Sequence, residues 1–411
     1  MNMQKQSAGK EKLPKGAKDI YAMRKRKKRR KVLQQSIWML LLAVTVLVLY
    51  QRRDSWIPKL ETMGMRHQNQ RLGANAESDG NLPISVFGDT DYQTGSANGK
   101  LLLLSDAYLY FYETDGSQIA ARQHSYGSAM LQTAGDYALI YESGGTSFRL
   151  ETVAKTRFEK KTDDPIIFGR VSPNGQIALV TSAETCSCKM LVFNQKGQKI
   201  YERHCVERIS DLSFHNDDGG CFAVSSETDG GELKSVIHSY SFTEKTDLWT
   251  SQPLDMLAIS VYNTSGEEVF VLGDTQCCYL GADGSLISCF AYPDTLDRGV
   301  FSGETAALVF SNNEKRTNSV VILNGSAAAP VLRIYDKAVM DIQLQPERET
   351  VLVQLRSQLE SLSMTGERLG TVPVTDNSER ILLIGDYLFL HCYDHIGRMD
   401  APTFGTEKNS K

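Results

Sequence analysis

The cysteines carry the most direct chemistry in this sequence, because thiols can form disulfides, bind metals or act as nucleophiles. The chain has eight cysteines, all of them after residue 185. In a β-hairpin, residues that face each other have numbers with a constant sum, which the position of the turn sets. Turns centred on Lys196-Gly197 and Asp283-Gly284 would each bring two cysteines face to face. The two pairs are Cys188 with Cys205, and Cys278 with Cys289.

The two pairs differ in how well they suit a disulfide. Opposed Cβ atoms on neighbouring strands lie about 4.5–5.5 Å apart, and they are closer on non-hydrogen-bonded rungs. Counted from a two-residue turn, Cys188 and Cys205 fall on such a rung, whereas Cys278 and Cys289 fall on a hydrogen-bonded rung. We therefore predict the first disulfide more strongly than the second. The alternative is two pairs of half-buried free thiols.

Other groupings of His, Cys and Asp do not match the spacing of metal sites. Zinc sites usually pair cysteines separated by two to four residues. This chain instead has Cys186-x-Cys188 and the adjacent pair Cys277-Cys278. The pair Asp217-Asp218 lacks the alternating oxygen ligands of a calcium loop. We predict no metal site and no cofactor.

The elements that must position these residues are β-strands. From Pro83 to about Arg398, short apolar runs rich in Val, Ile, Leu, Tyr and Phe alternate with turn clusters of Gly, Asp, Asn and Ser. No window shows an apolar period of 3.6 residues for more than about two helical turns. This pattern is typical of an all-β sandwich, barrel or propeller.

A weak internal repeat favours the propeller. Its unit is an apolar strand, a short turn, a second strand ending in an aromatic residue, a glycine turn and a third strand. Copies start near residues 101, 137, 177, 221, 269, 306 and 351. The linking segments supply a fourth strand, as at 209–214, 257–261 and 339–344. A period of about 40 residues with four strands is the blade period of a β-propeller.

We predict an all-β fold, a β-propeller of about eight blades, with about seven as the alternative, because the repeat region spans roughly 315 residues. Ile84–Phe87 should join the sheet formed by Ile381–Tyr393, so that the two ends of the propeller close the ring. Such closure protects the edges of the terminal strands.

The N-terminal region predicts a membrane anchor. Val32–Tyr50 is long enough to cross the bilayer as a helix, at about 1.5 Å per residue. A basic block precedes it, so the positive-inside rule places the N-terminus in the cytoplasm and the rest outside the cell. A cleaved signal peptide is the alternative, but no small-x-small cleavage site follows the apolar run. The residues of this topology signal are Arg24, Lys25, Arg26, Lys27, Lys28, Arg29, Arg30 and Lys31.

The predicted organisation has five parts. They are a basic cytoplasmic tail (1–31), a transmembrane helix (32–51), a stalk (52–80), the β-propeller (81–398) and a disordered tail (399–411). Residues 1–31 carry 13 Lys and Arg and two Asp and Glu, a charge of +11; subtracting this from the net charge of −4 leaves −15 for the remainder. An acidic exported portion is a poor candidate for binding nucleic acid.

The chain resembles a family of Gram-positive single-span membrane proteins with an exported β-propeller of unknown function. The resemblance extends over most of residues 30–398 and implies architecture and location at the cell membrane, but no activity. The segments that carry it are Leu82-Pro83-Ile84, Tyr108-x-Tyr110-x-Tyr112-x-x-Asp115-Gly116, Ala138–Tyr141 with Gly144-Gly145, and Val192-Phe193-Asn194 with Gly197.

Enzyme motifs are absent from the sequence. It contains no Gly-x-Ser-x-Gly, His-Glu-x-x-His, P-loop or dinucleotide fingerprint, and no Trp-Asp pair or sialidase-type box. We therefore expect a non-catalytic binding or scaffold module of the cell envelope that takes a protein, peptide or glycan partner at the central face of the propeller. The alternative is an extracellular hydrolase or lyase that acts on an envelope glycan or peptide.

Overall fold

The structure is a computed structural model that describes residues 39, 81–86, 92–244, 246–374 and 378–402. The chain divides into two compact units, residues 1–61 and 62–411, and Met39 is the one described residue of the first. The basic block at 24–31, most of the predicted transmembrane helix and the stalk at 52–80 therefore lie outside the described residues. Among the residues that are described, no helix is long and apolar enough to cross a membrane.

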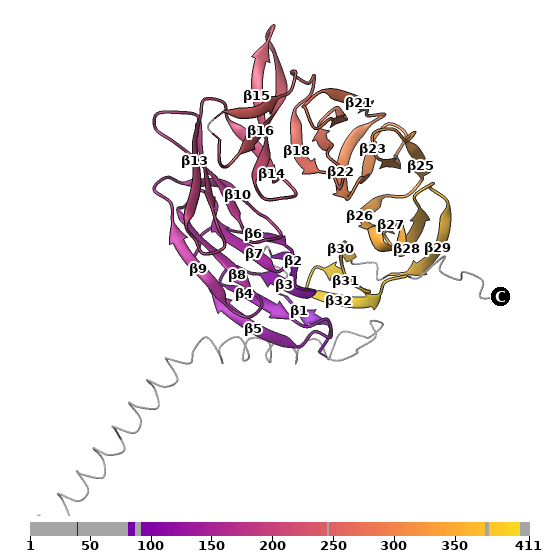
Figure 1. The fold of residues 1–411 in the computed structure, drawn as a ribbon. Helices are drawn as coiled ribbons and strands as arrows, with labels where there is room; N and C mark the ends of the chain where they lie inside the picture. The colour runs from indigo at the N-terminus through magenta and orange to yellow at the C-terminus, as the bar shows by residue number, and fades with distance from the viewer. Residues whose placement is uncertain (1–38, 40–80, 87–91, 245, 375–377, 403–411) are drawn as a thin grey trace, which may run out of the picture. The chain divides into compact units, whose positions relative to one another are not determined.

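The second unit contains eight four-stranded antiparallel sheets, which confirms the eight-bladed propeller (Figure 1). In each of the first seven blades the strands follow one another from the inner edge to the outer edge. The first strand of most blades contacts the first strand of a neighbouring blade, so these strands lie on the inside of the ring. The linking segments predicted at 209–214, 257–261 and 339–344 are three of these inner strands.

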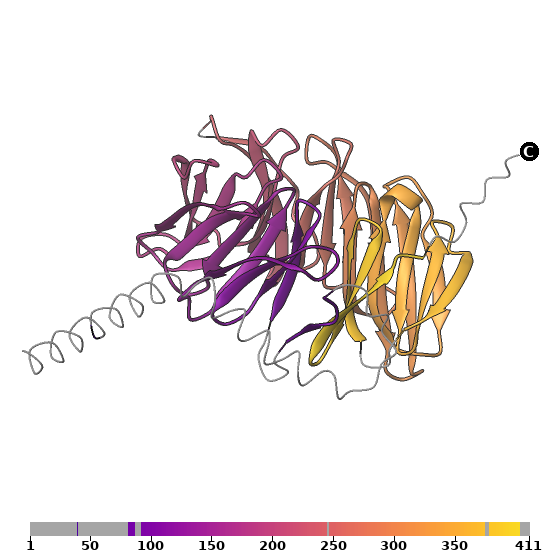
Figure 2. The same ribbon diagram turned by 90° about the horizontal axis from the view of Figure 1, so that it is seen from below.

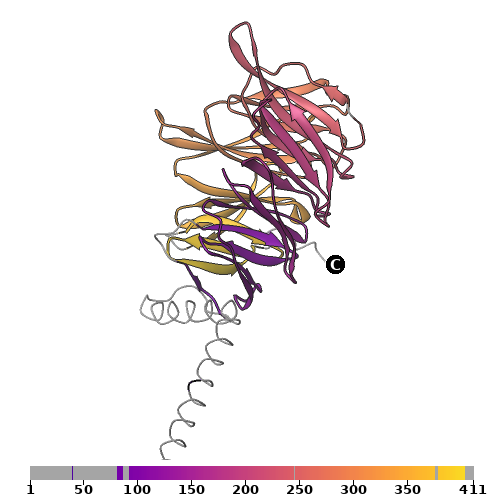
Figure 3. The same cartoon turned by 90° about the vertical axis from the view of Figure 1, so that its left-hand side faces the viewer.

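The blades are numbered here in chain order. Blade 1 contains β2 (Gln93–Ala97), β3 (Lys100–Leu104), β4 (Tyr108–Tyr112) and β5 (Gln118–Gln123). Blade 2 contains β6 (Ala129–Ala134), β7 (Tyr137–Glu142), β8 (Ser147–Thr152) and β9 (Thr156–Lys161). Blade 3 contains β10 (Ile166–Val171), β11 (Ile177–Thr181), β12 (Cys188–Phe193) and β13 (Lys199–Cys205). Blade 4 contains β14 (Ile209–Phe214), β15 (Gly220–Asp229), β16 (Glu232–Ser241) and β17 (Asp247–Thr250); its long β15–β16 hairpin extends beyond its neighbours in Figures 1 and 3.

The second half of the ring follows the same plan. Blade 5 contains β18 (Ala258–Asn263), β19 (Val269–Gly273), β20 (Gln276–Leu280) and β21 (Leu286–Ala291). Blade 6 contains β22 (Thr295–Ser302), β23 (Thr305–Asn312), β24 (Thr317–Asn324) and β25 (Val331–Tyr335). Blade 7 contains β26 (Val339–Gln345), the 3-10 helix η1 (Pro346–Arg348), β27 (Thr350–Leu355), β28 (Gln358–Ser363) and β29 (Arg368–Pro373). Blade 8 contains β30 (Ser378–Ile384), β31 (Tyr387–Cys392), β32 (His395–Asp400) and β1 (Ile84–Ser85).

Blade 8 closes the ring as predicted. Its outermost strand is β1, from the start of the propeller, which pairs antiparallel with β32 through Ile84↔Ile396 and Ser85↔His395. Figure 2 shows the indigo N-terminal strand beside the yellow C-terminal strands. The boundary predicted at residue 398 was too early, because β32 continues to Asp400. Beyond it, Ala401 is buried and donates its N–H to Asp386 O at 2.8 Å.

The core lies between blades, which explains the apolar runs in the sequence. Strands in the middle of a blade are covered on both faces, so β4, β11 and β27 are buried at every position. One cluster joins Val180 and Val192 of blade 3 to Leu212 and Ala223 of blade 4. Outer strands such as β21 alternate between exposed and partly buried residues. Strands buried on both faces read as continuous apolar runs, whereas strands with one solvated face alternate.

The hairpin loops differ from the predicted two-residue turns. In four blades, three residues separate the hydrogen-bonded ends of the loop, as in Gly281 N–H to Ser285 O at 2.8 Å. The glycine has positive φ, +79° at Gly284, but the preceding Asp283 does not. Asp283 Oδ1 instead accepts the Ser285 N–H at 3.0 Å. A β-bulge follows each loop, and the four glycines are Gly116, Gly197, Gly284 and Gly366.

Candidate functional site

A cavity of about 500 Å³ lies against the inner strands of blades 2 to 5 and is the candidate binding site at the predicted central face. The strands β6, β10, β14 and β18 form its walls near their C-terminal ends. The β10–β11 loop, with Pro173 and Asn174, and Asn216 of the β14–β15 loop also line it. Four consecutive blades therefore build one site, from residues that are up to about 130 positions apart in the chain.

An ion pair lines this cavity. Arg170 Nη2 of β10 contacts Asp211 Oδ1 of β14 at 2.5 Å, and the Asp211 side chain is 3% exposed. Asp211 Oδ2 also accepts the backbone N–H of Val261 in β18 at 3.1 Å. Burial raises the pKa of the Asp211 carboxyl above its usual range, although Arg170 opposes the shift. One side chain thus connects three successive inner strands.

The same connection recurs on the other side of the ring. Arg298 Nη1 of β22 contacts Asp341 Oδ1 of β26 at 2.9 Å, and Asp341 Oδ2 accepts the Ile381 N–H of β30 at 2.8 Å. Asp211 and Asp341 each follow a β-bulge in their inner strand. Because the bond to the next blade recurs at equivalent positions, we assign these carboxylates to holding the blades in register.

The remaining ionisable groups of the cavity also have partners within the protein. Ser172 Oγ donates to Asp218 Oδ2 at 2.8 Å, and His215 Nε2 lies 3.1 Å from Ser239 Oγ. Burial lowers the pKa of the His215 imidazole, which favours its neutral form. By contrast, within the described part of the chain the side chains of Gln132, Asn174 and Ser213 make no hydrogen bond to the protein. The side-chain groups that can hydrogen-bond to a ligand without giving up a partner in the protein are therefore neutral amides and a hydroxyl.

A Ser-His-Asp arrangement lies within blade 4, and the sequence contains no motif that could have revealed it. Ser225 Oγ of β15 lies 2.8 Å from His238 Nε2 of β16, and His238 Nδ1 lies 3.3 Å from Asp247 Oδ2 of β17. These are the contacts of a nucleophile, a base and an orienting acid. Ser225 is only 1% exposed and lies between strands, so no substrate can reach it. The network connects three strands instead of performing catalysis.

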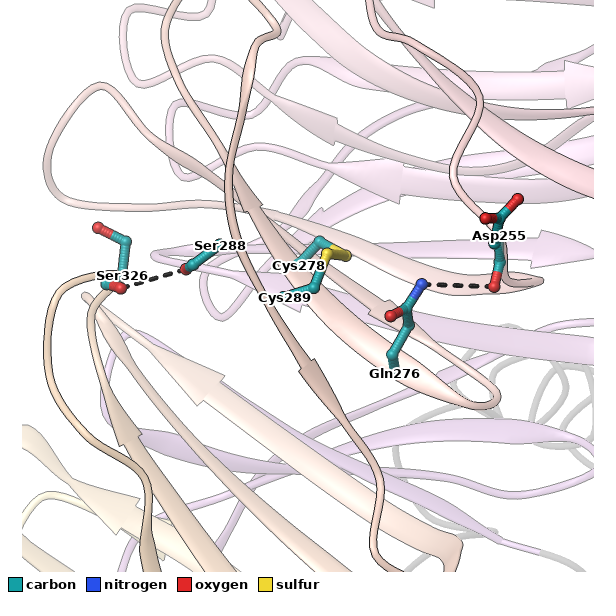
Figure 4. The surroundings of a disulfide bond; sticks show 6 residues. All are labelled: Asp255, Gln276, Cys278, Ser288, Cys289 and Ser326. Atoms are coloured by element: carbon teal, nitrogen blue, oxygen red, sulfur yellow. Dashed lines mark hydrogen bonds between the residues drawn. A yellow bond between two sulfur atoms is a disulfide. The ribbon is translucent and has the colours of Figure 1, made fainter.

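The structure places both predicted cysteine pairs face to face. Cys188 pairs with Cys205 across β12 and β13, and Cys278 pairs with Cys289 across β20 and β21. Both pairs face each other as predicted although the turns differ from the prediction. The observed loop alone would shift the pairing of the strands by one residue, and the extra residue of the β-bulge shifts it back. Cys278 and Cys289 form a disulfide, with Ser288 and Gln276 nearby on the same two strands (Figure 4). Cys188 and Cys205 are thiols.

This reverses the predicted order of the two pairs, and the loop geometry explains why. The Cα atoms of Cys278 and Cys289 lie 4.1 Å apart, which fits the close, non-hydrogen-bonded rung. Cys278 lies three residues before the loop residue Gly281, whereas Cys188 lies six residues before the equivalent Asn194. Hydrogen-bonded and non-hydrogen-bonded rungs alternate along a hairpin. Cys188 and Cys205 therefore occupy a hydrogen-bonded rung, on which opposed Cα atoms lie about 5.5 Å apart.

We expect non-reducing peptide mapping of the oxidised protein to recover Cys278 linked to Cys289. The cysteines are 11 residues apart, and a bridge over a loop of this size stabilises by about 3 kcal/mol in the chain-entropy model. The Cys278→Ser variant should therefore melt at a lower temperature than the oxidised parent and at a similar temperature to the reduced parent. Recovery of Cys289 bound to Cys277 would contradict the observed register.

The histidines and cysteines in the described part of the chain do not form a metal site. Among the described residues, no group of three or more His, Cys, Asp or Glu side chains could hold a metal ion. His391 is buried and its ring lies 6.1 Å from that of Tyr92. His395 contacts Asp394 at 2.7 Å, and its hydrogen bonds to Cys392 and Asp394 raise its pKa to about 9.

Buried histidines should make the propeller sensitive to acid. Burial lowers the pKa of His391 to about 4 and also lowers the pKa values of His124, His215 and His238. Below about pH 6.5 the unfolded chain binds protons at these residues that the folded chain does not, so stability falls as the pH falls. Between pH 6.5 and 4, His391 alone should account for about 3 kcal/mol.

Urea denaturation at a series of pH values checks this expectation. His391→Gln should reduce the slope of unfolding free energy against pH by about 1.4 kcal/mol per unit between pH 4.5 and 6. His204→Gln is the control, because the His204 side chain is 55% exposed. Equal slopes for the parent and His391→Gln would show that His391 is protonated in the folded state.

The fold and the inner cavity define the class of protein, an eight-bladed β-propeller whose site is built by several blades. The chain belongs to a family of unknown function, DUF5711, which matches residues 81–383. This agrees with the unknown function of the family that the sequence resembles. No curated protein sequence matches the chain.

Solved structures with the same fold come from distant sequences. Sqt1 from Chaetomium thermophilum is 12% identical, with a TM-score of 0.57 over 80% of this chain and 99% of that chain. BamB from Moraxella catarrhalis is 11% identical, with a TM-score of 0.52 over 76% of this chain and 97% of that chain. A Sqt1 structure bound to the N-terminus of the ribosomal protein L10 is 12% identical, with a TM-score of 0.51 over 75% of this chain and 92% of that chain. At these identities the likeness shows the fold alone.

Proposed function

We propose that this protein is a non-catalytic binding module of the cell envelope, anchored by one membrane span and carrying its propeller outside the cell. The anchor rests on the sequence, in which the basic block at 24–31 precedes the apolar run Val32–Tyr50. The propeller takes an extended, uncharged segment of a protein or peptide partner in the cavity of blades 2 to 5. Through that segment it acts as a scaffold.

One observation carries the choice of ligand. The charged side chains in the cavity are held by other groups of the protein, whereas Gln132, Asn174 and Ser213 offer amides and a hydroxyl. Such groups match the N–H and C=O groups of a peptide backbone. An ionic ligand would have to compete with the pair between Arg170 and Asp211. The distant propeller Sqt1, whose structure contains the N-terminus of L10, is an example of the same fold with a bound peptide segment.

Site-directed photo-crosslinking in the full-length, membrane-bound protein tests the site. A crosslinking amino acid at Asn174, which is exposed at the cavity, should capture a protein partner. The same amino acid at Ser357 is the control, because the β27–β28 loop lies on the opposite face. Equal capture at both positions, or at neither, would exclude the cavity as the binding site.

A double variant tests the chemistry of binding. Gln132→Ala with Ser213→Ala removes two hydrogen-bonding groups, each contributing about 1 kcal/mol, so the affinity for the captured segment should fall roughly tenfold or more. The melting temperature should stay within about 2 °C, because neither side chain bonds to the protein. Turnover of the segment instead of binding would favour the hydrolase or lyase alternative.

A reporter enzyme fused after Lys411 tests the orientation of the anchor. The reporter should be active outside the cell, since the basic block lies on the cytoplasmic side of the span. Replacing the eight basic residues of 24–31 with Gln and Ser should reduce that activity. Reporter activity confined to the cytoplasm of the parent would reject the proposed location.

A further inference from the structure

A second hollow lies on blade 3, on the face opposite the cavity. The cavity is next to the β10–β11 loop, and the β11–β12 loop lies at the other end of the antiparallel strand β11. This second loop forms a surface hollow of about 390 Å³. The side chains around it are Glu184, Thr185, Cys186, Ser187 and Val206.

Cys186 in this hollow has a proton acceptor beside it. Its Sγ lies 3.8 Å from Nδ1 of His204, and Nε2 of His204 lies 3.2 Å from Oε1 of Glu202. His204 can therefore accept the thiol proton while Glu202 holds the other side of the imidazole ring. The Cys186 thiol is also partly exposed and within 3.3 Å of Cys188 O. Thiolate formation and access are the two requirements for a reactive cysteine.

A pair of thiols begins two residues after Cys186 in the chain. Cys188 and Cys205 face each other across β12 and β13, and both are buried. The hydrogen bond from Cys205, opposed by burial, lowers the pKa of Cys188 to about 7, whereas that hydrogen bond and burial raise the pKa of Cys205. Ser187 N–H donates to Cys205 O at 3.0 Å, which attaches the loop of Cys186 to the end of this pair.

The other free cysteines have different surroundings. Cys221, Cys277 and Cys392 are all buried. Burial raises the pKa of Cys221 and of Cys277 to about 12, so their thiolates are rare at neutral pH. Of the six free cysteines, Cys186 is thus the one with both exposure and a neighbouring base.

We propose that Cys186 is a thiol-exchange site that accepts a small-molecule disulfide, such as oxidised glutathione, and passes the disulfide to Cys188 and Cys205. His204 is the base that takes the Cys186 proton, and the hollow holds the small molecule. This site is separate from the peptide cavity, and it does not depend on the function proposed for that cavity.

The reaction proceeds through three exchanges that balance. The Cys186 thiolate attacks one sulfur of the small disulfide, which forms a mixed disulfide and releases one small thiol. The Cys188 thiolate then attacks Cys186 Sγ and releases the second small thiol. Cys205 finally attacks Cys188 Sγ, which restores the Cys186 thiol. The two protein thiols are oxidised by two electrons, and the small disulfide is reduced to two thiols.

Time-resolved peptide mapping tests the order of events. The full-length protein in detergent, with its six free cysteines as thiols and the bridge between Cys278 and Cys289 intact, is mixed with excess oxidised glutathione, acid-quenched at intervals, alkylated and mapped without reductant. Glutathione should appear first on Cys186 and should disappear as Cys188 becomes linked to Cys205. In Cys205→Ser the reaction should stop at Cys186, either with glutathione attached or linked to Cys188. A first adduct on any other cysteine, or no adduct, overturns the proposal.

Three variants separate chemistry from structure. Cys186→Ser should slow formation of the bond between Cys188 and Cys205 by about tenfold or more, whereas Cys221→Ala should leave the rate unchanged. His204→Gln should slow the first adduct at pH 7 but not near pH 9.5, where a thiol can lose its proton to the solvent without a neighbouring base. An unchanged rate in Cys186→Ser, or the same slowing by His204→Gln at both pH values, overturns the mechanism.

Discussion

Deletion of residues 81–86 is expected to open the propeller ring and to remove most of its stability. The deleted segment contains β1, the outer strand of blade 8. Leu82, Ile84 and Val86 are buried in one cluster with residues of blades 1 and 8, such as Tyr110 and Phe389. Burial of each aliphatic side chain stabilises by about 1.5–3 kcal/mol, so the three together represent roughly 5–9 kcal/mol. That is comparable with the whole stability of an ordinary domain, about 5–15 kcal/mol.

The deletion also exposes β32, whose unpaired N–H and C=O groups can pair with a second copy of the chain. We therefore expect a melting temperature lowered by at least about 10 °C, and aggregation during size-exclusion chromatography. Paired point variants refine the test, because Ile84 is 5% exposed whereas the neighbouring Ser85 is only partly buried. Ile84→Asp should reproduce most of the loss and Ser85→Asp little of it. A deletion variant that melts with the parent would contradict closure by β1.

The sequence predicts the ring because each blade repeats its own local signals. Strands in the middle of a blade, such as β11, are apolar throughout, and turn residues recur at a period of about 40 residues. The closing strand is predictable too, because the strand signal at Ile84–Phe87 comes before the first repeat and can find its partner at the other end of the propeller. The type of turn is not predictable in the same way, because Asp283-Gly284 fits both a two-residue turn and the observed three-residue loop. That one-residue difference decides which cysteine pair occupies the close rung.

The sites depend on contacts that the sequence does not contain. Arg170, Asp211 and Val261 are about 40 to 50 residues apart and meet only because successive inner strands lie side by side. The hydrogen bonds of Ser225 with His238 likewise come from the pairing of β15 with β16. Arginines and aspartates in short strands carry no signal that distinguishes an inner strand from an outer one. To assign roles to these residues, one must therefore know the order of the strands within each blade.

Replacement of Glu151 by Gln is expected to destabilise the protein by about 3–5 kcal/mol, the usual cost of removing one partner from a buried ion pair. Glu151 is completely buried in β8. Its carboxylate contacts Arg122 Nη1 at 2.7 Å and Arg149 Nε at 2.9 Å, and Arg122 belongs to the neighbouring blade 1. The Thr156 hydroxyl also donates to it at 2.9 Å. Without the carboxylate, two guanidinium groups remain close together with little access to water.

Equilibrium denaturation in urea measures this cost, and Glu113→Gln is the matched control. Glu113 contacts Lys100 at 2.6 Å with a side chain that is 42% exposed, and such surface pairs contribute about 0–1 kcal/mol. Burial raises the pKa of the Glu151 carboxyl above its usual range, so burial alone disfavours the charged form. Arg149 and Arg122 oppose this shift and stabilise the carboxylate. Replacing both members, Glu151→Leu with Arg149→Met, should therefore be less destabilising than Glu151→Leu alone, because no unpaired charge is left at Arg149. If the double variant loses as much unfolding free energy as Glu151→Leu and Arg149→Met lose in sum when made singly, the role of Glu151 is packing and not charge neutralisation.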